Sequence, residues 1–271
     1  KGLFTQGMVC HQTYKDKNNN WLSPDEVFSN DEKKYFVKNK PSESVAVGPS
    51  ESMSKSKRNT IDPEKMINAY GADAVRLFIL SDSPPEKDIQ WSETGMTSAY
   101  KFIQKFWILS ENILTLSKQK IDKSANEEIE IFTNQAIDKI NIALEKFRYN
   151  VIIAVFHEIF NFYNKILNEE KNHINLKENF KNILVVMSPV IPHLSNECLE
   201  KISNQQLYKW PLVDKKFLDT EEKDIVIQIN GKKRGNILIN KKVEEIELLE
   251  KIKKMEIINK YIRGKKISKT I

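Results

Sequence analysis

The stretch GPSESMSKSKRN, residues 48–59, decides how the rest of this sequence is interpreted. It carries three cations, Lys55, Lys57 and Arg58, and Met53 is its only large apolar side chain. Serines are interleaved with these residues: Ser50, Ser52, Ser54 and Ser56. Because such a segment has little apolar surface to bury, the sequence predicts a mobile polar loop. Mobile ammonium groups suit a polyphosphate, whose developing charge they can stabilise and then release, whereas the plainer interpretation is a solvated basic loop.

The segment that follows, residues 60–80, predicts two short helices joined end to end. Asp62 is a good N-cap and Pro63 fits the first helical position, while Gly71 provides a stop. We expect Asp73 to cap the second helix. That helix has a broad apolar face, formed by Ala74, Val75, Leu77, Phe78, Ile79 and Leu80. The basic loop is therefore expected to be anchored to a rigid, buried element.

Apolar residues recur at helical spacing through the middle of the chain. They predict five helices, over residues 97–118, 129–149, 151–167, 176–187 and 194–202. Helices of this length with short polar links favour an α-helical bundle. Ahead of the loop, residues 1–14 are apolar and favour strand, and residues 21–47 alternate short apolar groups with charged turns. We interpret this first part as the edge of a larger domain with a small excursion of strands.

Composition and charge limit the function classes. The chain has 271 residues, of which 40% are hydrophobic and 30% charged, enough for about two domains with real cores. No apolar run is long enough for a membrane helix and no signal-peptide pattern opens the chain, so we expect a cytoplasmic protein that does not contact membranes. Cys10 and Cys198 stand far apart without a CxxC motif, so neither a disulfide framework nor a metal site is predicted.

The basic charge is concentrated in the tail. Residues 223–271 hold 14 Lys and Arg against 6 Asp and Glu, a balance of +8, which leaves 29 minus 31, or −2, for the first 222 residues. Residues 225–229 and 236–239 predict a hairpin around Asn230-Gly231, followed by a helix over 243–255 and a last strand over 265–271. The hairpin tip carries three cations suited to backbone phosphates: Lys232, Lys233 and Arg234.

Taken in order, these motifs resemble a known enzyme family. SMSKS at 52–56, followed by KRN, IDP, YGAD and VRLF, resembles the KMSKS region of class I aminoacyl-tRNA synthetases. SDSPPEKDIQWSETG at 81–95 and NGKKRG at 230–235 are most similar to the bacterial-type leucyl-tRNA synthetase family. The resemblance runs through nearly the whole chain.

The resemblance implies a mainly α fold in four parts. Residues 1–60 would be the C-terminal edge of a Rossmann-like catalytic domain carrying the KMSKS-like loop, and residues 61–96 would be connecting helices of the stem-contact type. Residues 97–220 would be the anticodon-binding-type helical bundle, which binds tRNA. Residues 221–271 would be a small basic α+β domain that also binds tRNA, and in the family this tail continues further.

The resemblance also implies a reaction. The whole enzyme would use ATP, with Mg²⁺, to activate leucine, would transfer leucine to tRNA(Leu), and would act as a monomer. Lys55 matches the motif lysine that stabilises the pyrophosphate leaving group and is the implied catalytic residue. The implied ATP-binding residues are Ser52, Met53, Ser54, Lys55 and Ser56. Ser52 replaces the family's first motif lysine, and we expect Lys57 and Arg58 to substitute partly for the missing charge.

Two alternatives stay open at this point. A sister synthetase for valine, isoleucine or methionine shares the loop but is not expected to have the NGKKRG hairpin. A non-catalytic RNA-binding module derived from a class I synthetase is favoured by Ser52. None of the histidines lies in an HxGH motif, so the chain alone would lack half of the site and be inactive; we interpret it as the C-terminal portion of a larger enzyme.

Overall fold

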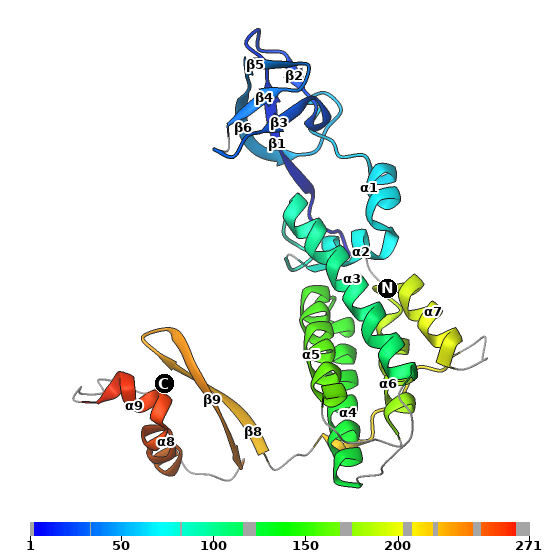
Figure 1. Cartoon of the computed structure of the whole chain (residues 1–271), viewed down its shortest axis with the longest axis vertical. Coiled ribbons are helices and arrows are strands. Elements are labelled where there is room, and N and C mark those ends of the chain that lie inside the picture. Colours follow the sequence, from blue (N-terminus) through cyan, green and yellow to red (C-terminus); the bar gives the residue numbers. More distant parts are fainter. Residues whose placement is uncertain are drawn as a thin grey trace. The chain divides into compact units, whose positions relative to one another are not determined.

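A computed structural model describes residues 3–32, 34–81, 83–115, 123–168, 175–202, 208–218, 222–240 and 245–263. Internal contacts divide the chain into two units, Lys1–Val213 and Asp214–Ile271. The first unit combines small sheets with a helical bundle, and the second is a small α+β unit (Figure 1). The expected fold class, mainly α with a small α+β tail, is confirmed.

Two small sheets form the beginning of the first unit. Their strands are β1 (Val9–Lys15), β2 (Trp21–Leu22), β3 (Val27–Ser29), β4 (Tyr35–Val37), β5 (Lys40–Ser44), β6 (Ala46–Ser52) and β7 (Ile89–Gln90). One sheet has the order β2-β1-β6, with β7 pairing parallel to β1, and the other has the order β3-β4-β5. A 3₁₀ turn, Pro24–Glu26, lies between β2 and β3. The expected excursion of strands over 21–47 is confirmed.

Strand β6 corrects one expectation about the loop. Residues 48–52 were expected to be mobile, but they continue β6 and pair antiparallel with β1, with Ser52 opposite Cys10 and Glu51 opposite His11. Polar side chains do not prevent this pairing, because the ladder is made by backbone groups and one sheet face can remain solvated. The loop proper is therefore shorter and begins after Met53.

The two short helices form as predicted, as α1 (Pro63–Tyr70) and α2 (Ala72–Ser81). The Asp62 carboxylate accepts a hydrogen bond from the Glu64 amide at 3.0 Å, and Gly71 ends α1 at φ 81°. The prediction that Asp73 caps α2 is wrong. Its carboxylate instead accepts from the Leu194 amide at 2.7 Å, so Asp73 caps a helix that lies 120 residues later in the sequence.

The bundle helices agree with the five predicted ones within a few residues at most ends. They are α3 (Glu93–Thr115), α4 (Lys123–Glu145), α5 (Tyr149–Asn168), α6 (Leu176–Met187) and α7 (Pro192–Ile202). Their apolar faces share one core, to which α2 adds Ala74, Leu77 and Phe78. The ring of Phe106 lies at its centre, fully buried, 5.9 Å from those of Phe102 and Phe180. The second of the two short helices after the loop is thus packed into the bundle.

The second unit is built on a hairpin. Strands β8 (Glu222–Ile229) and β9 (Lys232–Asn240) pair antiparallel, and Asn230 and Gly231 between them have φ values of 51° and 73°, as a tight hairpin turn requires. The predicted helix forms as α8 (Glu245–Lys254). A further helix, α9 (Glu256–Ile262), was not predicted; it buries Ile258. A 3₁₀ turn, Lys215–Phe217, precedes the hairpin, and the strand expected over 265–271 lies outside the described residues.

Truncating the central ring of the bundle tests this packing. We expect Phe106→Ala to lower the free energy of unfolding by about 3–5 kcal/mol, because the ring leaves a cavity among other buried rings. Ile108→Ala on the same helix is the control, since Ile108 is 58% exposed and its loss should cost well under about 1 kcal/mol. Chemical denaturation followed by circular dichroism measures both. Equal losses in the two variants would contradict the described core.

Candidate phosphate-binding loop

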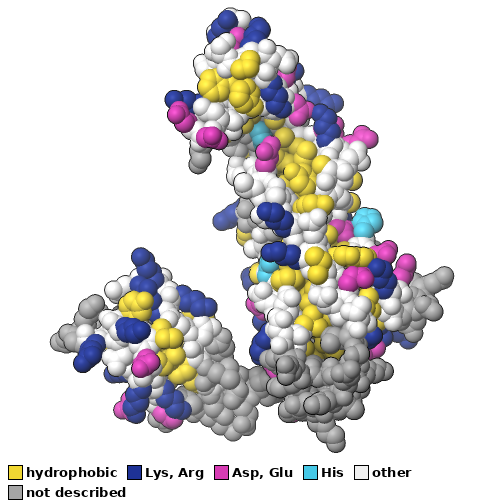
Figure 2. Space-filling view, viewed as in Figure 1, with side chains coloured by type: hydrophobic (Ala, Val, Ile, Leu, Met, Phe, Trp, Pro, Cys, Tyr) yellow, Lys and Arg dark blue, Asp and Glu magenta, His cyan; other side chains and the backbone are white. Residues whose placement is uncertain are grey.

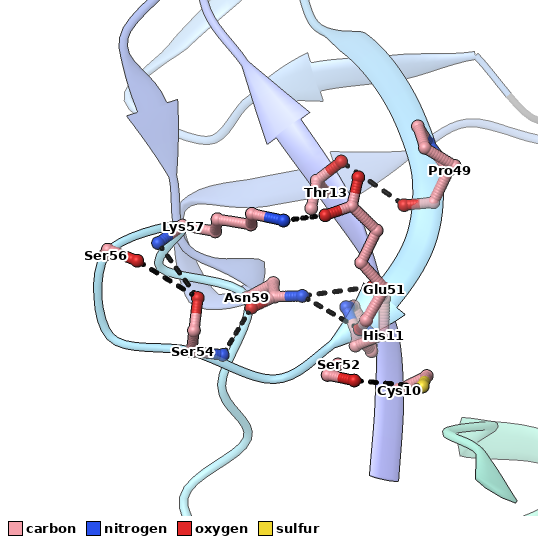
Figure 3. A network of polar contacts seen from close by, with 10 residues as sticks. All are labelled: Cys10, His11, Thr13, Pro49, Glu51, Ser52, Ser54, Ser56, Lys57 and Asn59. Carbon is pink, nitrogen blue, oxygen red and sulfur yellow. Dashed lines mark hydrogen bonds and ion pairs between the residues drawn. The ribbon is translucent and has the colours of Figure 1, made fainter. Parts of the chain in front are cut away.

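The two ends of the loop meet at a neck, formed by residues 51–54 and Asn59, and the buried Asn59 side chain holds this neck together (Figure 3). Asn59 is 0% exposed. Its side-chain carbonyl accepts from the Ser54 amide at 2.8 Å, and its side-chain amide donates to the backbone carbonyls of His11 and Glu51, both at 3.2 Å. One side chain therefore joins the beginning and the end of the loop to β1 and β6. Sequence reasoning missed this residue; the polar Asn at the end of the KRN motif was its only signal.

Inside the neck, the loop closes on itself in a tight turn. The Ser54 hydroxyl accepts from the Lys57 amide at 3.3 Å and lies 3.2 Å from the Ser56 hydroxyl. The Arg58 amide donates to the Lys55 carbonyl at 3.3 Å. Arg58 has φ 53°, a left-handed conformation that costs a residue with a side chain roughly 1 kcal/mol or more. The turn is thus fixed by several weak hydrogen bonds rather than by apolar packing.

The first two motif residues belong to the sheet rather than to the turn. The Met53 amide donates to the Val9 carbonyl at 3.0 Å, which extends the β6–β1 pairing by one residue. The Ser52 hydroxyl lies 4.0 Å from the Cys10 thiol. The five residues predicted to bind ATP therefore form one continuous segment, from the end of β6 into the turn. Their contact with ATP stays a prediction.

The three loop cations differ in their surroundings. Lys57 forms an ion pair with Glu51. The Arg58 guanidinium lies 3.0 Å from the Glu26 carboxylate and donates to the Trp21 carbonyl at 3.1 Å. Lys55 is exposed, and no hydrogen bond or ion pair involves its ammonium group within the part of the chain that the structure describes. Because Lys57 and Arg58 already neutralise carboxylates, the arrangement argues against their replacing the motif lysine absent at position 52.

The histidines have structural surroundings where they are described. His11 Nδ1 lies 2.8 Å from the Gln12 carbonyl, and His193 Nδ1 lies 2.9 Å from the Asp73 carboxylate. His157 packs edge-on against Phe102, with 4.6 Å between ring centroids, and burial lowers its pKa. His173 lies outside the described residues.

The cations predicted for the hairpin tip fall at the beginning of β9, in the second unit. Lys232 and Lys233 are exposed. The guanidinium carbon of Arg234 stacks 4.2 Å from the centre of the Tyr261 ring, and its Nη1 donates to the tyrosine hydroxyl at 3.2 Å. Arg234 therefore joins β9 to α9, and only the two lysines extend freely toward solvent.

The described residues contain no group of three His, Cys, Asp or Glu side chains arranged to bind a metal ion. None of the helices described is both long enough and apolar enough to span a membrane.

Comparison with family models supports the class that the loop and the bundle define. Residues 45–92, which include the loop, match the model of class I tRNA synthetases (I, L, M and V), and residues 126–252 match the anticodon-binding domain of tRNA ligases. The two matched segments are therefore similar, in this order, to part of a class I synthetase and to an anticodon-binding domain.

Along its entire length, the chain is similar to part of leucine–tRNA ligases. It is 37% identical over 275 residues to the ligase of Rickettsia bellii and 34% identical over 289 residues to that of Bartonella henselae. In each case the alignment covers 100% of this chain but 32% of the relative, so the chain spans about a third of the length of these relatives. The resemblance to leucyl-tRNA synthetase is confirmed.

A solved structure shares the fold. The crystal structure of the ternary complex of Agrobacterium radiobacter K84 agnB2 LeuRS-tRNA-LeuAMS matches 80% of this chain and 29% of that chain, with a TM-score of 0.56 and 21% sequence identity.

The buried asparagine gives a direct test of the loop geometry. We expect Asn59→Ala to leave the Ser54 amide without this acceptor and to remove one hydrogen bond from each of the His11 and Glu51 carbonyls, which costs about 1–3 kcal/mol locally. Hydrogen exchange over residues 51–60 should then be at least about 5-fold faster. Thr60→Ala, at the exposed neighbouring position, is the control. Unchanged exchange in Asn59→Ala would show that this side chain does not hold the neck.

Proposed function

We propose that this chain supplies the phosphate-binding loop and the tRNA-binding parts of a leucine–tRNA ligase, which joins leucine to tRNA(Leu) at the expense of ATP in the cytoplasm. The observation that carries the proposal is the match to leucine–tRNA ligases over the whole chain. In this proposal residues 1–60 are the edge of the catalytic domain and 61–96 the connecting helices. Residues 97–220 and 221–271 are the two tRNA-binding parts, and the enzyme acts as a monomer.

Lys55 is the proposed catalytic residue. The leucine carboxylate attacks the α-phosphorus of ATP, the bond between the α-phosphorus and the bridging oxygen breaks, and pyrophosphate leaves, with Mg²⁺ entering as part of the ATP substrate. Lys55 has an exposed ammonium group that forms no ion pair with any residue the structure describes, so it reaches the departing phosphates without first breaking one. Ser54 and Ser56 hold the turn that presents Lys55, and Ser52 and Met53 join it to the sheet. Positive charge placed where negative charge develops lowers the activation barrier.

The second unit is the stronger candidate for contact with tRNA phosphates. Its cations are spread over the hairpin and the two helices (Figure 2), and residues 223–271 carry a balance of +8, from 14 Lys and Arg against 6 Asp and Glu. Lys232 and Lys233 are exposed, so they are free to bind phosphate. Arg234 supports them by fixing β9 against Tyr261. Phosphate contacts of this kind add affinity without reading sequence.

A second candidate, a non-catalytic RNA-binding module, rests on Ser52. In that case the loop would have lost one motif lysine because activation was no longer selected. Both candidates predict salt-sensitive binding of tRNA, so only an activation assay separates them.

Removing the Lys55 ammonium tests the proposed chemistry. In the complete, upstream-extended protein we expect Lys55→Ala to lower leucine-dependent ATP–pyrophosphate exchange on the order of 10²-fold or more. Lys40→Ala, an exposed lysine on β5, should leave exchange unchanged. Isoleucine, valine and methionine, assayed in parallel, should support no exchange. A folded wild-type protein that is silent with all four amino acids would favour the non-catalytic module.

The exposed lysines of the hairpin give a separate test of tRNA binding. We expect Lys232→Ala together with Lys233→Ala to weaken tRNA binding and to reduce the salt dependence of log Kd by about 2, as expected for two lost phosphate contacts. Leucine activation should not change. Lys251→Ala with Lys254→Ala on α8 removes the same charge elsewhere on the unit. Equal losses in both pairs would mean that net charge, rather than the hairpin, attracts tRNA.

A further inference from the structure

The short strands between β1 and β6, the small excursion of strands, contact the loop through the acidic 3₁₀ turn Pro24–Glu26. Glu26 Oε2 lies 3.0 Å from Arg58 Nη2, and Asp25 Oδ2 lies 2.5 Å from Lys65 Nζ. A third bond runs from Arg58 Nη1 to the Trp21 carbonyl, at 3.1 Å. These contacts attach the end of the loop and the first helix after it to a segment that lies 32 to 40 residues earlier in the sequence.

The acidic turn is itself fixed in place. Glu26 Oε2 also accepts from the backbone amide of Ser23 at 2.8 Å and from its hydroxyl at 3.0 Å, a capping box that closes the turn. The Ser23 amide holds the pKa of Glu26 below its usual range, and the hydrogen bond from Lys65 does the same for the pKa of Asp25. Both carboxylates therefore stay charged well below neutral pH and keep their cations.

The cations in and next to the loop differ in whether a carboxylate pairs with them. Lys57, Arg58 and Lys65 are each paired with a carboxylate, whereas Lys55 is exposed and takes part in no ion pair that the described residues form. If Arg58 were released, two neighbouring cations would compete for the same phosphates, and the turn that positions Lys55 would lose its attachment at one end. Small displacements of a reacting group are costly, because a misplacement of about 1 Å can lower a rate by about 100-fold.

We propose that Glu26 and Asp25 are positioning residues, which hold Arg58 and Lys65 so that the loop presents Lys55 alone to the phosphates. The inference rests on the proposed function, because it names the residues that act through the same loop. The two carboxylates do not contact the substrate. Their effect on the reaction is exerted through Arg58 and Lys65.

Pyrophosphate exchange in the complete ligase measures the effect on the reaction. We expect Glu26→Gln with Asp25→Asn to lower kcat for leucine activation about 5-fold or more, because a loop released at one end positions Lys55 less accurately. The KM for ATP should stay within about 2-fold, because the group that meets phosphate is unchanged. Glu32→Gln is the matched control, since Glu32 pairs with Lys34 on the same excursion of strands.

A double-mutant cycle separates positioning from general damage. If Glu26 acts through Arg58, then Glu26→Gln combined with Arg58→Gln should be no slower than the slower single variant. Independent, multiplying losses would overturn the proposal. A lower KM for ATP in Glu26→Gln would also overturn it, because Arg58 would then be a phosphate ligand that Glu26 withholds.

Limited trypsin digestion of the same complete ligase tests the attachment without using activity. We expect cleavage after Arg58 to be at least about 3-fold faster in Glu26→Gln than in wild type or Glu32→Gln, because local opening exposes the bond. Equal cleavage rates would overturn the inference. Unchanged exchange in Glu26→Gln, alongside a large loss in Lys55→Ala, would overturn the positioning role and leave the proposed function standing. Unchanged exchange in Lys55→Ala would overturn the proposed function, while the digestion would still decide whether the attachment exists.

Discussion

The buried carboxylate of Asp73 is the interaction on which the first unit depends. Asp73 is only 6% exposed. Burying a carboxylate is costly unless hydrogen bonds compensate for the lost water. Here the amides of His193 and Leu194 donate to it at 3.3 and 2.7 Å, at the positive end of α7. Asp73 thereby attaches α2 to the bundle.

Arg76, one turn further along α2, also attaches this helix to the bundle, but as a hydrogen-bond donor rather than an acceptor. Its Nε donates to the Val190 carbonyl at 2.9 Å, and its Nη2 donates to the Pro189 carbonyl at 2.7 Å. The carbonyls that accept these bonds belong to residues 188–193, SPVIPH, which lead into α7 and contain two prolines, Pro189 and Pro192. Since α1 and α2 follow directly after the loop, the position of the candidate turn is set by the bundle as well as by the sheet.

Sequence reasoning predicted the features that arise from local periodicity and missed those that arise from distant partners. The bundle helices could be predicted because their apolar residues recur at helical spacing, and the hairpin because Asn230-Gly231 suits a left-handed turn. The true partner of Asp73 could not, because a good capping residue looks the same whichever helix it caps. The strand through Glu51 and Ser52 was missed because its partners are backbone groups of β1, which leave no apolar pattern.

In the candidate site, too, the sequence indicated the residues that lie together in the chain but not those brought together by the fold. The motif located Lys55 and the serines around it, since they lie together in the sequence. It could not indicate that Asn59 closes the neck, or that Arg58 is held by Glu26, because both depend on strands that return to the loop from earlier in the chain. The structure thus changes the meaning of the motif: of the three cations within residues 48–59, two neutralise carboxylates. With Ser52 at the first motif position, the chemistry proposed for this loop depends on a single ammonium group and on how well its turn is held.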